Sequence, residues 1–126
     1  MLEMLCKLEH VIVYCSEMKR SVAFYRDVLG FPVMLESPEW TEFHCGGVKL
    51  ALRLAEKAEE KRQDGPDRAG ETRLGFEVLE IEKFFQEKKQ RGAVFSLPPA
   101  ITDSGRKRAV MLDPDGLPIQ VTEEIR

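Results

Sequence analysis

The sequence is short of cysteine and of long apolar runs, and each shortage excludes a class of protein. It has only three cysteines, an odd number without the close-paired spacing of zinc sites, so we interpret them as reduced thiols. No apolar run is long enough to span a bilayer, and the N-terminal residues mix acids with bases, unlike a signal peptide. We therefore expect a cytoplasmic protein with no membrane partner.

The sequence also lacks the patterns of nucleotide and nucleic-acid binding. The net charge is −3 and no stripe of basic residues stands out, so we expect no nucleic-acid partner. Neither a phosphate-binding loop nor a dinucleotide fingerprint is present. With 126 residues, 43% of them hydrophobic, the chain fits one domain or two small half-domains that share a core.

Residues 8–31 predict a strand, a short turn and a helix. The first residues alternate, with Leu8, His10, Ile12 and Tyr14 on one face, which is typical of a strand. Ser16 is a suitable N-cap for the helix that follows. Apolar residues then recur at helical spacing until Gly30, which can adopt the left-handed conformation that ends a helix.

The remaining residues predict a second copy of this unit. In the first half, strands are expected at 33–35, 40–45 and 48–54, with a hairpin turn at Gly46-Gly47. In the second half we expect a strand at 72–79, a helix at 80–91 ended by Gly92, strands at 94–97, 108–112 and 119–122, and a tight turn at 113–116.

Between the copies lies a segment dense in charge. Residues 55–71 contain almost no apolar side chain, so we interpret them as an exposed linker, with a helical stub at 55–63. The modules would then span residues 1–54 and 72–126. The predicted fold is α+β, with tandem βαβββ modules forming a curved mixed sheet, helices outside and a concave cleft that suits a ligand.

The duplicated unit resembles the vicinal oxygen chelate superfamily. The resemblance rests on HVIV at residues 10–13, SVAFYRDVLGF at 21–31 and DPDGLPIQV at 113–121. This superfamily includes glyoxalase I, extradiol dioxygenases, fosfomycin-resistance enzymes and bleomycin-resistance proteins. The resemblance implies a homodimer whose clefts are shared between halves or between chains.

The resemblance also implies where a metal would bind. Metal-using members place ligands on the first and last strand of each half, which here correspond to His10, Ala51, Arg73 and Gln120. Only His10 is a ligand type, whereas a catalytic divalent metal needs about three protein ligands. We therefore predict no metal cofactor. The alternative is a divalent metal assisted by side chains on a neighbouring strand, namely Glu42 and His44.

The same positions suggest what the cleft binds instead. The candidate ligand-binding residues are His10, Arg53, Arg73 and Gln120, with Lys49 on the strand face of Arg53 and Trp40 at the rim. A guanidinium group in a cleft needs an anionic or planar acceptor, which favours a small organic anion or polar ligand. A structural alternative stays open, in which Arg73 pairs with Glu77 or another acidic residue and His10 is a hydrogen-bonded core residue.

Three functions are compatible with this pattern. The first is a bleomycin-resistance-like module that binds a small molecule without metal. The second is a glyoxalase-like lyase or isomerase, or a dioxygenase-related enzyme, which would use a divalent metal or else His10 as general base with Arg73 stabilising an oxyanion. The third is a regulatory domain without a ligand.

Overall fold

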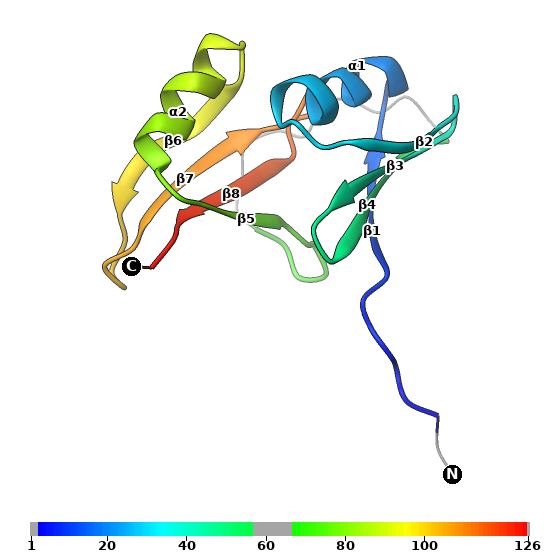
Figure 1. Cartoon of the computed structure of the whole chain (residues 1–126), viewed down its shortest axis with the longest axis horizontal. Coiled ribbons are helices and arrows are strands. Elements are labelled where there is room, and N and C mark those ends of the chain that lie inside the picture. Colours follow the sequence, from blue (N-terminus) through cyan, green and yellow to red (C-terminus); the bar gives the residue numbers. More distant parts are fainter. Residues whose placement is uncertain (1–2, 57–66, 126) are drawn as a thin grey trace. The chain divides into compact units, whose positions relative to one another are not determined.

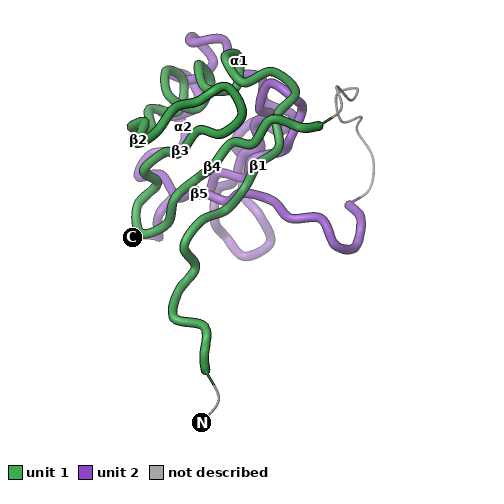
Figure 2. The backbone as a smooth tube through the Cα atoms, turned by 90° about the vertical axis from the view of Figure 1, so that its right-hand side faces the viewer, with its two compact units in different colours: residues 1–59 green, residues 60–126 purple. Residues whose placement is uncertain are grey.

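The chain folds into two compact units with the same order of elements. The computed structural model describes residues 3–56 and 67–125, and the units are Met1–Glu59 and Glu60–Arg126 (Figure 2). Each unit is a strand, a helical segment and three further strands, which confirms the predicted α+β fold of tandem βαβββ modules. The predicted module bounds, the linker and the cleft between modules stay predictions, and the expected helical stub at 55–63 lies largely outside the described residues.

Unit 1 is a four-stranded mixed sheet with one helical segment (Figure 1). The strand order is β1-β4-β3-β2, in which β1 and β4 are parallel and the other pairs are antiparallel. Its elements are β1 (His10–Cys15), α1 (Met18–Ala23), the π-helical η1 (Phe24–Val28), β2 (Val33–Glu36), β3 (Trp40–Cys45) and β4 (Val48–Leu54).

Unit 2 repeats this topology with the order β5-β8-β7-β6. The first and last strands are again parallel neighbours, and the remaining pairs are antiparallel. Its elements are β5 (Leu74–Val78), α2 (Ile81–Gln90), β6 (Val94–Ile101), β7 (Lys107–Leu112) and β8 (Pro118–Glu123). None of the helices that the structure describes is long and apolar enough to cross a membrane.

The core of unit 2 lies between its sheet and α2, which runs along one face of that sheet (Figure 1). Successive strand residues point to opposite faces, so every second side chain of β7 and β8 faces the helix. These helix-facing side chains are at most 1% exposed: Ala109, Met111, Ile119 and Val121. The intervening residues, among them Arg108 and Gln120, therefore lie on the face away from α2.

The predicted helix stops are confirmed, but one predicted helix start is wrong. Gly30 and Gly92 have φ angles of +84° and +92°, the left-handed conformation expected where each helical segment ends. Ser16 is not the N-cap of α1, because the helix begins one residue later and Glu17 holds that position without a side-chain cap. The Ser16 hydroxyl instead accepts a hydrogen bond from Arg20 Nη2 at 2.9 Å.

Strand β6 is longer than the sequence predicted. We expected it to end at Leu97, before Pro98-Pro99, but it continues to Ile101. Proline removes a backbone donor, which a strand tolerates at the edge of a sheet or at a bulge. Both conditions hold, since β6 is the edge strand and its pairing with β7 is irregular on both sides of Leu97.

The turn between β7 and β8 depends on one buried carboxylate. Asp113 is 5% exposed, and its Oδ1 accepts hydrogen bonds from the backbone amides of Asp115 at 2.9 Å and Leu117 at 2.8 Å. Gly116 supplies the positive φ of +84° that the predicted turn requires. This turn fixes the register of β7 against β8, whose open face is described below.

Replacement of this carboxylate should destabilise unit 2. Asp113→Ala leaves two amides without their charged acceptor, so we expect a loss of about 2 kcal/mol in the free energy of unfolding. Urea denaturation followed by circular dichroism measures the change. Asp103→Ala is the matched control, since Asp103 is an exposed aspartate in the neighbouring β6–β7 turn. Equal stability of the two variants would contradict this role for Asp113.

Candidate functional site

Several predicted site residues of unit 1 share the sheet face that lies away from its core. Register places His10 beside Lys49, Trp40 beside Arg53, and Glu42 beside Ala51. Partners in register point to the same side of a sheet, so these side chains lie on one face. Two apolar residues of β1 on this face, Ile12 and Tyr14, are 37% and 62% exposed.

A charged network joins part of this face. Glu42 accepts a hydrogen bond from Trp40 Nε1 at 2.8 Å and lies 3.8 Å from the Lys49 ammonium group. The Lys49 ammonium is also 3.9 Å from a Glu9 carboxylate oxygen, and His10 Nδ1 is 3.7 Å from the other. The rings of His10 and Trp40 meet edge to face, with centroids 6.1 Å apart.

The position of His10 in this network tests the alternative that His10 is a hydrogen-bonded core residue. Its side chain is 38% exposed, so the interpretation of His10 as a core residue is wrong. The Trp40 indole donates to Glu42, and the prediction that Trp40 lies at a cleft rim and that Trp40 and His10 bind a ligand stays a prediction. Arg53 is exposed and forms no ion pair with another residue in the described part of unit 1.

Arg73 forms ion pairs with acidic groups of its own unit. Its Nη2 lies 2.7 Å from Glu71 and 3.0 Å from Asp67, and its Nη1 donates to the Thr72 carbonyl at 3.0 Å. The expectation of an acidic partner is confirmed, but the specific pairing with Glu77 is wrong. Glu77 is instead 3.4 Å from Arg106, a residue of the β6–β7 connection.

The donor set at the family's metal positions does not fit a metal ion. Ala51 is fully buried and has no donor atom, and the guanidinium of Arg73 repels a cation and is held by carboxylates. A neutral amide such as that of Gln120 is a poor ligand for a transition metal. Across residues 3–56 and 67–125, no three His, Cys, Asp or Glu side chains gather in a way that could hold a metal ion.

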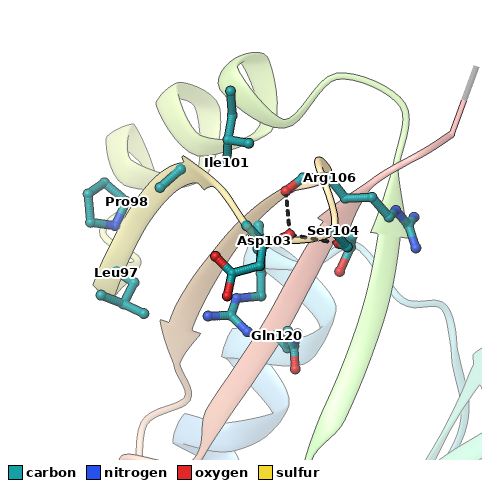
Figure 3. A pocket seen from close by; sticks show the side chains of 11 residues that line it. Leu97, Pro98, Ile101, Asp103, Ser104, Arg106 and Gln120 are labelled. Atoms are coloured by element: carbon teal, nitrogen blue, oxygen red, sulfur yellow. Dashed lines mark hydrogen bonds between the residues drawn. The ribbon is translucent and has the colours of Figure 1, made fainter.

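Unit 2 contains a pocket on the sheet face away from α2 (Figure 3). Its volume is about 750 Å³. Arg108 of β7 and Gln120 and Thr122 of β8 line one side, and register places Arg108 directly beside Thr122. Gln120 is therefore the one predicted ligand-binding residue that the structure places in this pocket.

The edge strand and the β6–β7 turn complete the pocket. Leu97 and Pro98 contribute apolar surface from β6, and Asp103 contributes a carboxylate from the turn. Figure 3 shows these side chains grouped around the space above Gln120. The lining thus combines apolar, amide, hydroxyl and charged groups in one concave surface.

The two arginines that line the pocket differ in how their charge is balanced. Arg106 Nη2 donates to the Glu123 carbonyl at 2.8 Å and lies 3.4 Å from Glu77, so this guanidinium ties β8 and β5 to the turn. Arg108 is exposed and forms no ion pair or hydrogen bond with another residue in the described ranges. Arg108 is therefore the cation that is available to a ligand.

Sequence reasoning missed Arg106, Arg108 and Asp103, although strand alternation could have identified Arg108. The alternation that placed Arg53 on the face of Ala51 also applies to β7, where it places Arg108 on the face of Gln120. Asp103 and Arg106 lie in a connection whose geometry depends on β6 continuing through its two prolines. No local pattern in the sequence indicated that extension.

Comparison with known proteins identifies the family. The family model of the Glyoxalase/Bleomycin resistance protein/Dioxygenase superfamily matches residues 7–121, and the chain belongs to this superfamily. It is 30% identical over 132 aligned residues to the uncharacterized protein YwkD of Bacillus subtilis (strain 168), covering 96% of this chain and 99% of YwkD.

Two solved structures have the same fold over nearly the whole chain. The protein SMU.1112c is 26% identical with a TM-score of 0.82, covering 95% of this chain and 100% of that one. A glyoxalase family protein from Enterococcus faecalis is 25% identical with a TM-score of 0.80, covering 93% and 97%.

The three cysteines differ in how far they are exposed to solvent. Cys15 is 2% exposed, Cys6 is exposed, and burial raises the pKa of the Cys45 thiol. A raised pKa reduces the thiolate fraction at neutral pH, and the thiolate is the reactive form.

Alkylation should therefore discriminate among the three thiols. With iodoacetamide at pH 7, we expect Cys6 to react first and Cys45 to lag, and we expect the rate at Cys45 to rise as the pH approaches its raised pKa. Peptide mass spectrometry over a pH series measures each site, with the Cys6→Ser variant isolating Cys45. Reaction of Cys45 as fast as Cys6 at pH 7 would contradict this assignment.

Proposed function

We propose that this superfamily member binds a small, anionic or polar organic molecule without a catalytic metal, using the pocket of unit 2. The observation that carries this function is the Arg108 guanidinium, which has no ionic partner in residues 3–56 and 67–125 and lines a pocket of about 750 Å³ with Gln120 and Thr122. Small-molecule sites have volumes of roughly 300–1,000 Å³ and combine apolar walls with a few placed polar groups.

The chemistry of the lining supports an anionic group on the ligand. A guanidinium donates in a planar fork that matches a carboxylate or enolate, and the half-buried Gln120 and Thr122 can add neutral hydrogen bonds. Leu97 and Pro98 offer apolar surface to the rest of the ligand. A small organic acid with an apolar portion satisfies both kinds of surface.

Binding without metal rests on the donor set described above. The enzymatic alternative with His10 and Arg73 is less well supported, because two carboxylates hold the Arg73 guanidinium and it would have to leave them to stabilise an oxyanion. From the superfamily resemblance we also propose a homodimer, and from the three cysteines, which we interpret as reduced thiols, a cytoplasmic location.

Removal of the Arg108 charge should weaken anion binding. With 3-phenylpropanoate as the probe, we expect Arg108→Gln to raise Kd at least about tenfold, because a hydrogen bond to a charged group contributes about 1.5–3 kcal/mol. Isothermal titration calorimetry measures Kd. Lys83→Gln is the matched control, since Lys83 is an exposed residue of α2, on the other side of the sheet, and the change also removes one positive charge.

Two outcomes of this titration would overturn the proposal. One is wild-type protein that shows no saturable binding of the acid. The other is an Arg108→Gln variant that binds as tightly as the Lys83→Gln control while both remain folded by circular dichroism.

Elemental analysis tests the proposal that the protein holds no catalytic metal. Protein purified without chelators should contain far less than one equivalent of zinc, nickel, manganese or iron, because the donor set at the family positions is incomplete. Inductively coupled plasma mass spectrometry gives the stoichiometry. One tightly held equivalent that survives dialysis would return attention to the divalent-metal alternative, with Glu42 and His44 as the first ligands to replace.

A further inference from the structure

We infer that the ligand of the unit 2 pocket is a zwitterion, an α-amino acid with an apolar side chain or a close derivative that keeps both charges. In this arrangement Arg108 binds the carboxylate and Asp103 binds the ammonium group. The inference rests on the proposed function and extends it from the anionic half of the ligand to the whole molecule.

The first observation is that Asp103 has no structural task in its turn. The β6–β7 turn is closed by backbone hydrogen bonds from Thr102 to the Arg106 carbonyl at 2.8 Å and from Gly105 to the Thr102 carbonyl at 2.9 Å. The Thr102 hydroxyl reinforces it, with 2.9 Å to the same Arg106 carbonyl and 2.8 Å to the Ser104 hydroxyl. Asp113, by contrast, uses its carboxylate to hold the β7–β8 turn.

The second observation is where the Asp103 carboxylate lies. It lines the pocket, and Figure 3 shows it directed toward the space between Leu97 and Gln120. Asp103 is exposed and forms no hydrogen bond or ion pair with another residue that the structure describes. The carboxylate is therefore available to a ligand from the side of the pocket formed by the turn.

The third observation is the charge balance of the lining. Arg106 is paired with Glu77 and donates to the Glu123 carbonyl, whereas Arg108 and Asp103, the other charged groups of the lining, have no ionic partner in the part of the chain that the structure describes. They have opposite signs and line the same pocket without pairing with each other. A purely anionic ligand would gain from Arg108 but meet repulsion from Asp103, whereas a zwitterion of matching polarity gains from both.

The fourth observation concerns the rest of the ligand. Leu97 and Ile101 line the pocket and are 49% and 71% exposed, and Pro98 lies between them on β6. Covering this surface with an apolar side chain removes it from water, which favours binding. Free amino acids with aliphatic or aromatic side chains meet all three requirements within the volume available.

Three probes that share a phenethyl group separate the charges. 3-Phenylpropanoate carries only the anion, phenethylamine only the cation, and L-phenylalanine both. By isothermal titration calorimetry at pH 7, we expect L-phenylalanine to bind about tenfold more tightly than either probe with a single charge, because only the zwitterion engages both Arg108 and Asp103.

Variants then assign each charge to its residue. Asp103→Asn should remove the advantage of L-phenylalanine while leaving 3-phenylpropanoate binding equal or tighter, and Asp103→Ser provides a second variant should the first alter the turn. Arg108→Gln should weaken both acids. Glu82→Gln and Lys83→Gln on α2 are the matched charge controls and should leave every Kd unchanged.

The outcomes distinguish the two levels of the hypothesis. If L-phenylalanine binds no more tightly than 3-phenylpropanoate, or its advantage survives both Asp103 variants, the zwitterion is wrong while Arg108-dependent anion binding stands. If no probe binds in an Arg108-dependent manner, the zwitterion and the proposed function both fail.

Discussion

The alternation of buried and exposed side chains along β7 and β8 is the constraint on which the rest of unit 2 depends. Ala109, Met111, Ile119 and Val121 are at most 1% exposed beneath α2, and burial of such apolar surface stabilises a small module. Because the side-chain period of a strand is two, this burial fixes Arg108 on the opposite face. A shift of one residue would bury a guanidinium and expose the core, so the position of the site is tied to the stability of the sheet.

The pocket shows how two neighbouring arginines can have different tasks. Arg106 connects the turn to β5 and β8 through one carboxylate and one carbonyl, and this connection holds the turn that carries Asp103. Arg108, two residues further, lines the same pocket and has no such partner among the residues that the structure describes. One guanidinium is held by the fold and the other is not, a difference that neither residue type nor charge count could reveal.

The fold was largely predictable from the sequence because local sequence patterns indicate the helices and strands of each module. The alternating strands, the helical spacing and the glycines at 30 and 92 all mark their own positions, and the duplication supports each assignment with a second copy. Errors arose where a longer-range contact overrode the local preference. Strand β6 can continue through Pro98-Pro99 because it is an edge strand. It pairs with β7 alone, so it tolerates residues that lack a backbone donor.

The candidate site was less predictable, since it depends on which charges are already satisfied. Arg73 was predicted to lie in the strand at 72–79, but it directly precedes β5. Its partners are Asp67 and Glu71 in the preceding segment, and no periodicity links them. His10 was predicted to bind a ligand, and periodicity gave no sign that Glu9 lies beside both His10 and Lys49 in the fold. Parity identifies the face on which a side chain lies, whereas its availability depends on neighbours that only the folded chain brings together.

The two prolines of β6 have a consequence for how this protein behaves in a crowded solution. An unpaired sheet edge is a template on which another chain can anneal and begin an aggregate. Two consecutive residues without an amide hydrogen interrupt the row of donors that such a strand would need. The prolines therefore disfavour the addition of another strand at β6, which borders the pocket. The apolar side chains of β6 can then remain exposed without promoting fibril formation.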